Sequence, residues 1–333
     1  VIQARFKLSQ LGESIYYNNN KGIIIESVEV PELEYNTVYA RREDGEANWG
    51  RKEASQGDSN NHSKEIFRVE GTAPVLSAES GFYDDSFELS MTAIDGGEIY
   101  YTLDGSEPTP ESLQYETPIV ISDASGNANN YSARNDLQVG MAYLPEFLVD
   151  KATVVRAASY DARTGTLSET VTKTYFVSFE QKEEYNGYSI ISLITDPTYL
   201  FDEDYGIYGN GRKVTEMTAN GEVPSYLDSN AMNQGKEWER EAVLQYFDAF
   251  KVQQMDQKVG IRISGQSTRS AAQKSFNVYA RDIYDEASVI EYDFFEGKDY
   301  SSIKLRNGGS SHEESKIVDA FLQYLSAERN VSI

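Results

Sequence analysis

The chain has no cysteine and only two histidines among its 333 residues. It therefore offers no disulfide framework and no thiolate site, and His62 and His312 are too far apart in sequence to indicate a zinc cluster. No apolar run is long enough to span a bilayer, so no membrane insertion is expected. Cations are also scarce, because 30 Lys and Arg stand against 54 Asp and Glu, a net charge of −24. This balance excludes non-specific binding of nucleic acid and disfavours docking on an anionic membrane.

What the chain does contain is aromatic residues, with 24 Tyr and 14 Phe against 2 Trp. They lie in short apolar runs broken by Gly, Asn and Asp, a texture typical of β-sandwiches. The length allows two or three domains. The chain begins at Val1 with neither an initiator Met nor a signal peptide, so we interpret it as a processed or partial product.

Residues 1–66 are predicted to form strands at 6–8, 14–17 and 23–30, with a turn that ends at Gly22. The pieces RFKLSQLGESIYY, GIIIESVEVPEL, VYARREDGEANW and SQGDSNN resemble the later part of a lamin-tail domain. The resemblance implies a partial immunoglobulin-like sandwich that serves as an accessory interaction module.

Residues 67–179 are predicted to form a second sandwich. A strand-like segment runs into Asp104-Gly105, a hairpin signal, and residues 123–136 are polar enough for a long surface loop. With APVLSAESGFY, QYETPIVI, ATVVRAASYD and TKTYFV, this part resembles the chitobiase/β-hexosaminidase C-terminal domain. Asp104 and Glu107 could form a carboxylate pair for glycoside chemistry. We favour turn chemistry, because Asp-Gly and Glu-Pro both promote turns.

Residues 180–333 are predicted to form a mixed α/β unit after a charged linker at 181–187. A strand is expected at 190–194, and a strand rather than a helix at 242–247. Residues 202–204 are interpreted as a solvated acidic turn, since they match a calcium loop poorly. A helix is predicted at 311–328, where Ser311 and Glu314 form a capping box, and His312 in its first turn is interpreted as a surface residue.

A polar loop between two alternating strands is the strongest candidate for a functional site. Strands predicted at 259–264 and 275–281 flank a loop that begins with a glycine and carries hydroxyls and two cations. Such a loop can bind an anion such as phosphate through main-chain N–H groups and cations. The alternatives are a solvated turn and exposed ion pairs with nearby carboxylates. The candidate ligand-binding residues are Gly265, Ser267, Thr268, Arg269 and Lys274.

The third unit resembles the front half of the CotH family, the spore-coat-type atypical protein kinases. In family order the matching pieces are ISLITDPTYLFDEDYGIYGNG, WERE, GIRISGQSTR with QKSF, SIKLRNGG and DAFLQ. The resemblance implies a kinase-like α+β fold, ATP and Mg²⁺ as ligands, and phosphoryl transfer to Ser or Thr of a protein. It places the metal-binding and catalytic aspartates beyond Ile333, so the catalytic residues and metal ligands are unknown. A C-terminal fragment or second chain is expected to complete the fold.

The resemblance also implies an acid paired with Lys274, and the helix after Gly309 offers Glu313, Glu314 and Asp319. Together these features predict two immunoglobulin-like β-sandwiches followed by an incomplete kinase-like unit. The predicted function is that of an extracellular protein kinase, secreted or on the surface of a Gram-positive bacterium, with a protein substrate or surface partner. The alternative functions are a non-catalytic adhesion or structural protein and an accessory that binds polysaccharide.

Overall fold

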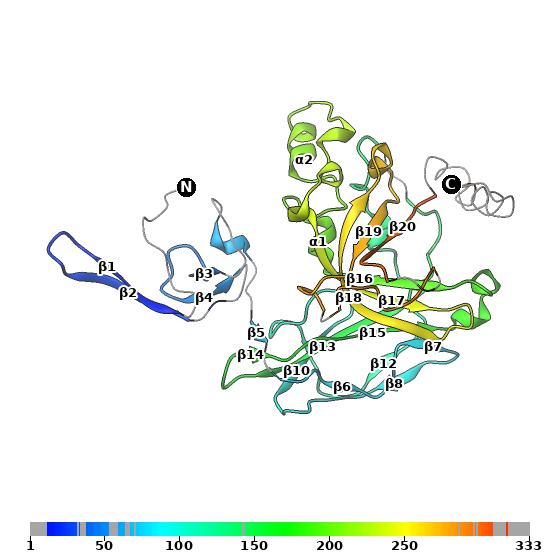
Figure 1. Ribbon diagram of the computed structural model, residues 1–333, viewed down its shortest axis with the longest axis horizontal. Coiled ribbons are helices and arrows are strands. Elements are labelled where there is room, and N and C mark those ends of the chain that lie inside the picture. The colour runs from blue at the N-terminus through cyan, green and yellow to red at the C-terminus, as the bar shows by residue number, and fades with distance from the viewer. Residues whose placement is uncertain are drawn as a thin grey trace. The chain divides into compact units, whose positions relative to one another are not determined.

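A computed structural model describes residues 12–31, 33, 38–52, 59–63, 67–69, 71–141, 144–285, 287–295, 297, 299–308 and 318. The chain divides into two compact units (Figure 1). Unit 1 comprises Val1–Gly71 and Asp161–Ser168, and unit 2 comprises Thr72–Tyr160 and Glu169–Ile333. The regular secondary structure of the described residues is mostly β-sheet with few helices, as expected of β-sandwich domains.

Unit 1 consists of short paired strands. The antiparallel pair β1–β2 confirms the strands predicted at 14–17 and 23–30, and Gly22 in the turn between them has a φ of +76°. The strand predicted at 6–8 lies outside the described residues. β3 pairs with β4 in antiparallel fashion, and β5 pairs in parallel with β14. The bounds are β1 Glu13–Asn18, β2 Ile24–Val30, β3 Val38–Arg41, β4 Trp49–Lys52, β5 Arg68–Val69 and β14 Thr166–Leu167, with a 3₁₀ turn at Asn60–His62.

The first half of unit 2 is a sandwich. One layer holds β11, β10, β13, β15 and β7 in that order, and the other holds the pairs β12–β8 and β6–β9. Their facing side chains form one buried apolar core, which includes Leu89, Ile121, Val155 and Tyr175. The bounds are β6 Val75–Leu76, β7 Gly81–Tyr83, β8 Phe87–Leu89, β9 Met91–Thr92, β10 Glu98–Thr102, β11 Leu113–Gln114, β12 Ile119–Ile121, β13 Thr153–Asp161 and β15 Val171–Val177.

The second half of unit 2 is a five-stranded antiparallel sheet in chain order, with two short helices between its first two strands. Strand β17 confirms the strand predicted at 242–247. Its side chains are buried on both faces of the sheet, which overrides the helix propensity of Glu, Ala, Leu and Gln. The bounds are β16 Ile190–Ile194, α1 Pro197–Phe201, α2 Arg212–Ala219, β17 Arg240–Phe247, β18 Gln253–Ser264, β19 Ser275–Tyr279 and β20 Ser302–Leu305.

The two halves of unit 2 share strand β15, which is buried on both faces. Tyr175 belongs to the sandwich core, whereas Phe176 packs edge-on against Phe247 of β17, with ring centroids 5.3 Å apart. The neighbouring Thr174 shares a hydrogen bond of 3.1 Å with Ser192 of β16. The sheet containing β15 is therefore a middle layer, with the five-stranded sheet on its outer side (Figure 1).

The predicted linker at 181–187 is packed rather than free. The ammonium group of Lys182 forms an ion pair with Asp150, and the Tyr185 hydroxyl donates a 2.8 Å hydrogen bond to the same carboxylate. This packing helps to explain why residues 72–160 and 169–333 form a single compact unit. Of the helix predicted at 311–328, the structure describes only Val318, which is helical. His312 and the candidate acids Glu313, Glu314 and Asp319 lie outside the described residues.

Candidate functional site

The candidate loop joins β18 to β19 and begins with a glycine that its conformation requires. Gly265 has a φ of +108°, and a Cβ there would lie 2.3 Å from the Thr268 hydroxyl oxygen. After this glycine, a 3₁₀ turn spans Ser267–Ser270. Gly265 and Ser267 are exposed, and Thr268 is half-buried. The start of the loop is thus the part that a ligand can reach.

Arg269 is buried and holds the loop closed. Its Nε donates a 2.8 Å hydrogen bond to the Gly265 oxygen, and its Nη1 donates to the oxygens of Ala231 and Asn233 at 3.2 and 2.9 Å. Burial lowers the pKa of its guanidinium, and the positive charge of Arg262 lowers it further. These contacts fasten the loop to the preceding segment, so the predicted role of Arg269 as a phosphate ligand gains no support.

Lys274 is also buried, at 5% exposure. Its amine donates hydrogen bonds to the main-chain oxygens of Leu137 and Ala271 at 2.8 and 2.7 Å, and lies 5.1 Å from the centre of the Tyr208 ring. Burial lowers the pKa of this amine from 10.5 to about 7. The described contacts of Arg269 and Lys274 are to carbonyl oxygens, which contradicts the alternative of exposed ion pairs.

A cavity of about 870 Å³ adjoins Lys274. The Tyr208 ring forms part of its wall, and so do Leu137 and Ala272, the neighbours of the lysine. The size and the mainly aromatic and aliphatic lining are those of a site for a small organic ligand. The lining residues are Tyr131, Ser132, Leu137, Gln138, Met141, Pro145, Phe147, Val149, Leu193, Thr195, Leu200, Phe201, Tyr208, Ile261, Ala272, Gln273 and Phe276.

Lys274 contacts residues that line this cavity, whereas Arg269 binds the oxygens of Ala231 and Asn233, so the two cations share no partner among the described residues. Sequence reasoning missed the segment after 136, because residues 123–136 were predicted to be a surface loop. The main-chain oxygen of Asp136 instead accepts a 2.8 Å hydrogen bond from Asn210, and the Gln138 side chain accepts one from Ala272 at 3.1 Å. The polar composition of this loop carried no signal that its end packs against the candidate site.

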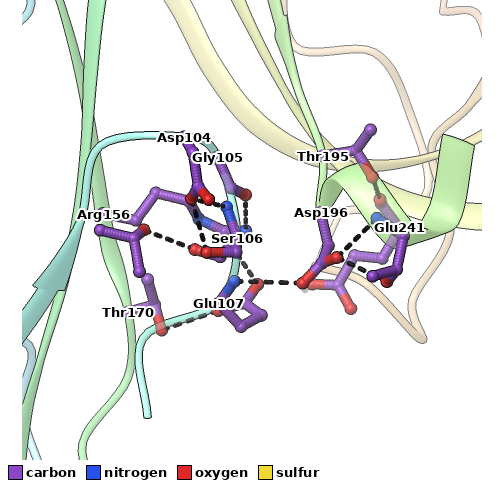
Figure 2. Close-up of polar contacts among 11 residues, drawn as sticks. Asp104, Gly105, Ser106, Glu107, Arg156, Thr170, Thr195, Asp196 and Glu241 are labelled. Atoms are coloured by element: carbon purple, nitrogen blue, oxygen red, sulfur yellow. Dashed lines mark hydrogen bonds and ion pairs between the residues drawn. The ribbon is translucent and has the colours of Figure 1, made fainter. Parts of the chain in front are cut away.

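The Asp104–Glu107 turn is structural, as predicted. The Asp104 carboxylate accepts hydrogen bonds from the nitrogen and hydroxyl of Ser106 at 3.0 and 2.6 Å. Glu107 forms an ion pair with the buried Arg156 (Figure 2). The Asp104 carboxylate thus stabilises the turn and the Glu107 carboxylate an ion pair, as the interpretation as turn chemistry expects.

The same turn joins the sandwich to the five-stranded sheet. The main-chain nitrogen of Glu107 donates a 3.3 Å hydrogen bond to Asp196, the N-cap of α1 (Figure 2). Glu241 of β17 lies nearby, and burial together with the charge of Glu107 raises its pKa. We interpret this cluster as a polar joint between the two halves of unit 2.

The acidic loop at 202–204 is also structural, which agrees with the interpretation as a turn. Asp202 accepts hydrogen bonds from the nitrogens of Asp204 and Tyr205 at 2.8 and 3.2 Å. Asp204 forms an ion pair with Arg212. Across the described part of the chain, no group of three His, Cys, Asp or Glu side chains is arranged to hold a metal ion.

Comparison with known families supports the sandwich alone. A family model described as "Fn3 associated" matches residues 87–175, which run from β8 into β15. The match covers well under half of the chain and fits an immunoglobulin-like β-sandwich. No curated protein matches the chain. In the described residues, no helix has the length and apolar character needed to cross a membrane.

Proposed function

We propose that unit 2 binds ATP, with the base in the cavity and the phosphates next to Lys274. On this proposal, the chain is the nucleotide-binding part of an extracellular CotH-like protein kinase. One observation carries the proposal: a buried lysine with no carboxylate partner among the described residues contacts Leu137 and Tyr208, which line an aromatic-lined cavity of about 870 Å³. Strongly perturbed ionisable groups beside a cavity are typical of functional sites.

Two other lysines of this chain have purely structural contacts that resemble those of Lys274. Lys52 and Lys251 also bind two main-chain oxygens each, at 2.6 to 2.7 Å, and none of these oxygens belongs to a residue that lines the cavity. Binding two carbonyls is therefore a way in which this chain fastens its segments. Lys274 differs in its position beside the cavity and in the strong effect of burial on its pKa.

The chemistry of Lys274 suits an anionic ligand. An amine with a pKa of about 7 is only partly protonated at neutral pH, and a phosphate beside it favours the charged form. The net charge of the whole chain is −24, which repels anions from most of the surface, so an anion is expected to bind at a cation without an acidic partner. The loop begins at the C-terminal end of β18, and its exposed residues Gly265 to Ser267 can approach the phosphates.

The described residues do not fit Mg²⁺, since they contain no cluster of three metal-binding side chains. Phosphoryl transfer needs carboxylates for the metal and a residue that positions the acceptor hydroxyl. Only nucleotide binding is assigned to the described residues.

Calorimetric titration of ATP into the wild type, Lys274→Met and Lys251→Met tests the proposal. Lys251 is the matched control, because its amine also binds two carbonyl oxygens but lies away from the cavity. We expect Lys274→Met to weaken ATP binding at least about tenfold, or roughly 1.4 kcal/mol, and Lys251→Met to leave it unchanged. Adenosine should bind the wild type and Lys274→Met alike, which shows that the variant is folded. Absence of ATP binding, or equal effects of both substitutions, overturns the proposal.

A second candidate is a non-catalytic surface protein built from sandwich modules. It is favoured by the finding that the loop cations already bind carbonyl oxygens and so complete the fold without a ligand. Under this candidate the partner is a surface protein or a polysaccharide. Both candidates place the protein outside the cell, either secreted or on the cell surface, and fractionation of the source cells tests that placement.

A further inference from the structure

A buried carboxylate organises two arginines on the sheet face opposite to the cavity. The Glu239 side chain is 5% exposed and accepts hydrogen bonds from Nε and Nη2 of Arg281 at 2.6 and 3.0 Å. Nε of Arg262 lies 3.2 Å from the same carboxylate, and the Tyr284 hydroxyl donates to it at 3.2 Å. Burial and the charge of Glu239 raise the pKa of Tyr284, so this hydroxyl stays protonated.

A glycine makes room for this arrangement. A Cβ on Gly260 would lie 2.5 Å from the Tyr284 ring and 2.6 Å from the Glu239 carboxylate. Tyr279 is the register partner of Gly260 on β19. The Tyr279 ring lies under both guanidinium groups, 4.3 Å from Arg262 and 4.7 Å from Arg281. The ring and the carboxylate together fix both arginines, as a preorganised binding site requires.

The arginines keep unused donors. Within the part of the chain that the structure describes, Arg262 donates no hydrogen bond, and Arg281 donates only through Nε and Nη2. Both Nη groups of Arg262 and Nη1 of Arg281 therefore have no described partner. Their side chains are 22% and 29% exposed, so these donors are within reach of a solvent-borne ligand.

The register adds another cation to this face. Arg262 pairs with Asn277, and Asn277 pairs with Lys304, so the three side chains form a row across β18, β19 and β20. Opposed side chains in a sheet point to the same face, and the cavity-lining Ile261 and Phe276 alternate to the other face. Lys304 is exposed. This row, together with Arg281, is called the cationic face.

The charge balance favours an anion. Arg262, Arg281, Lys304 and the nearby Arg269, whose pKa Arg262 lowers, stand against the carboxylates of Glu239 and Glu241. Glu241 pairs in register with Gly260 on this face, one pair away from the Arg262 row, and its charge raises the pKa of Tyr284. The positive end of the cluster is therefore the Arg262–Lys304 row. Guanidinium groups with free forks match carboxylates and phosphates.

We propose that the cationic face binds a phosphate monoester dianion, with Arg262 and Arg281 as ligands and Lys304 at the rim. Three unused guanidinium nitrogens and an ammonium group suit the three terminal oxygens of a phosphate better than the two oxygens of a carboxylate. The site lies on the opposite face from the proposed nucleotide cavity and does not depend on it. Its source can be a phosphorylated side chain of a protein partner or a free phosphorylated metabolite.

The test uses O-phosphoserine as the probe, with serine, glutamate and sulfate as comparisons. We expect saturable binding of phosphoserine that strengthens as pH rises through about 6, where the monoester becomes a dianion. Serine and glutamate should bind at least about tenfold more weakly. Sulfate should bind without this pH dependence. A phosphoserine peptide that binds more tightly than the free amino acid identifies a protein partner as the source, and equal affinities identify a small metabolite.

Arg262→Gln is the decisive variant, because removing Arg262 leaves the hydrogen bonds of Arg281 to Glu239 in place. We expect it to weaken phosphoserine binding at least about tenfold. Arg163→Gln is the control of equal charge change, since Arg163 is 88% exposed and forms an ion pair with Asp161 in unit 1. Equal weakening by both variants indicates general attraction and overturns the proposal, as does absence of saturable binding. If Arg262→Gln impairs ATP binding and Lys274→Met does not, the cationic face stands and the cavity proposal falls.

Discussion

The amine of Lys274 donates a hydrogen bond of 2.8 Å to the main-chain oxygen of Leu137, which lies 137 residues earlier in the chain. This contact links the candidate loop of the five-stranded sheet to the long loop of the sandwich. Gln138 strengthens the link by accepting a hydrogen bond from Ala272. The sandwich therefore takes part in building the cavity, and the environment of Lys274 depends on both halves of unit 2.

The burial of Lys274 predicts a pH dependence of stability. Its pKa is about 7 in the folded protein and near 10.5 when unfolded, so between these values the unfolded chain binds more protons. The free energy of unfolding should therefore rise between pH 7 and pH 10, by at most about 1.4 kcal/mol per pH unit from this group. Denaturant unfolding at several pH values measures the slope.

Lys274→Met should remove this part of the pH dependence and leave the slopes from other groups unchanged. Lys251→Met serves as the control and should keep the wild-type slope. If Lys274→Met and the wild type show the same rise above pH 7, Lys274 is not buried as described.

The strands around the candidate loop were predictable, because β18 and β19 alternate apolar and polar residues and Gly265 marks the turn. The burial of Arg269 and Lys274 was not predictable. Three of the five oxygens that bind them come from residues 137, 231 and 233, far away in sequence, and main-chain oxygens carry no residue-specific signal. The pairing of Glu239 with Arg262 and Arg281 was equally hidden, since it depends on the register of β17 and β18 and on the space left by Gly260.

Glu241→Gln should stabilise the protein slightly at neutral pH. Burial and the charge of Glu107 raise the pKa of the Glu241 carboxyl group, so its ionisation opposes folding as pH rises through the folded pKa. The advantage of the variant should be largest near pH 7 and vanish below the unfolded pKa. We expect about 0.5 kcal/mol or less, because the side chain keeps contact with solvent.

The comparison variant is Glu107→Gln, which should act in the opposite direction. It takes the carboxylate away from Arg156, whose side chain is 7% exposed, and should cost about 1 kcal/mol. Thermal unfolding of both variants at pH 4 and pH 7 provides the test. Stabilisation by both, or by neither, would contradict the polar joint of Figure 2.

Gly265→Ala should destabilise unit 2 by about 1–3 kcal/mol, because a Cβ adds backbone strain at φ +108° and a clash with Thr268. Gly96→Ala separates the two causes, since Gly96 has a φ of +82° and no atom within 4 Å of the added Cβ. The double variant Gly265→Ala/Thr268→Ala should regain the stability lost to the clash, because it removes the Thr268 hydroxyl, and should keep the cost of the backbone strain. Chemical denaturation of the four proteins measures each cost, and equal losses for Gly265→Ala and Gly96→Ala would show that the clash is absent.

Phe247→Ala should weaken the packing of the five-stranded sheet on the sandwich. The Phe247 ring is fully buried and meets Phe82 and Phe176 edge-on, with centroids 5.6 and 5.3 Å away. Removing a buried ring of this kind costs about 3–5 kcal/mol. One face of β15 packs in the sandwich core and the other packs against Phe247 of β17. We therefore expect the substitution to accelerate hydrogen exchange in β15 and β17 together. Phe250→Ala is the matched control, because Phe250 is 87% exposed and its removal should change stability by less than about 0.5 kcal/mol. Exchange that accelerates in β17 alone would mean that the two halves of unit 2 unfold independently.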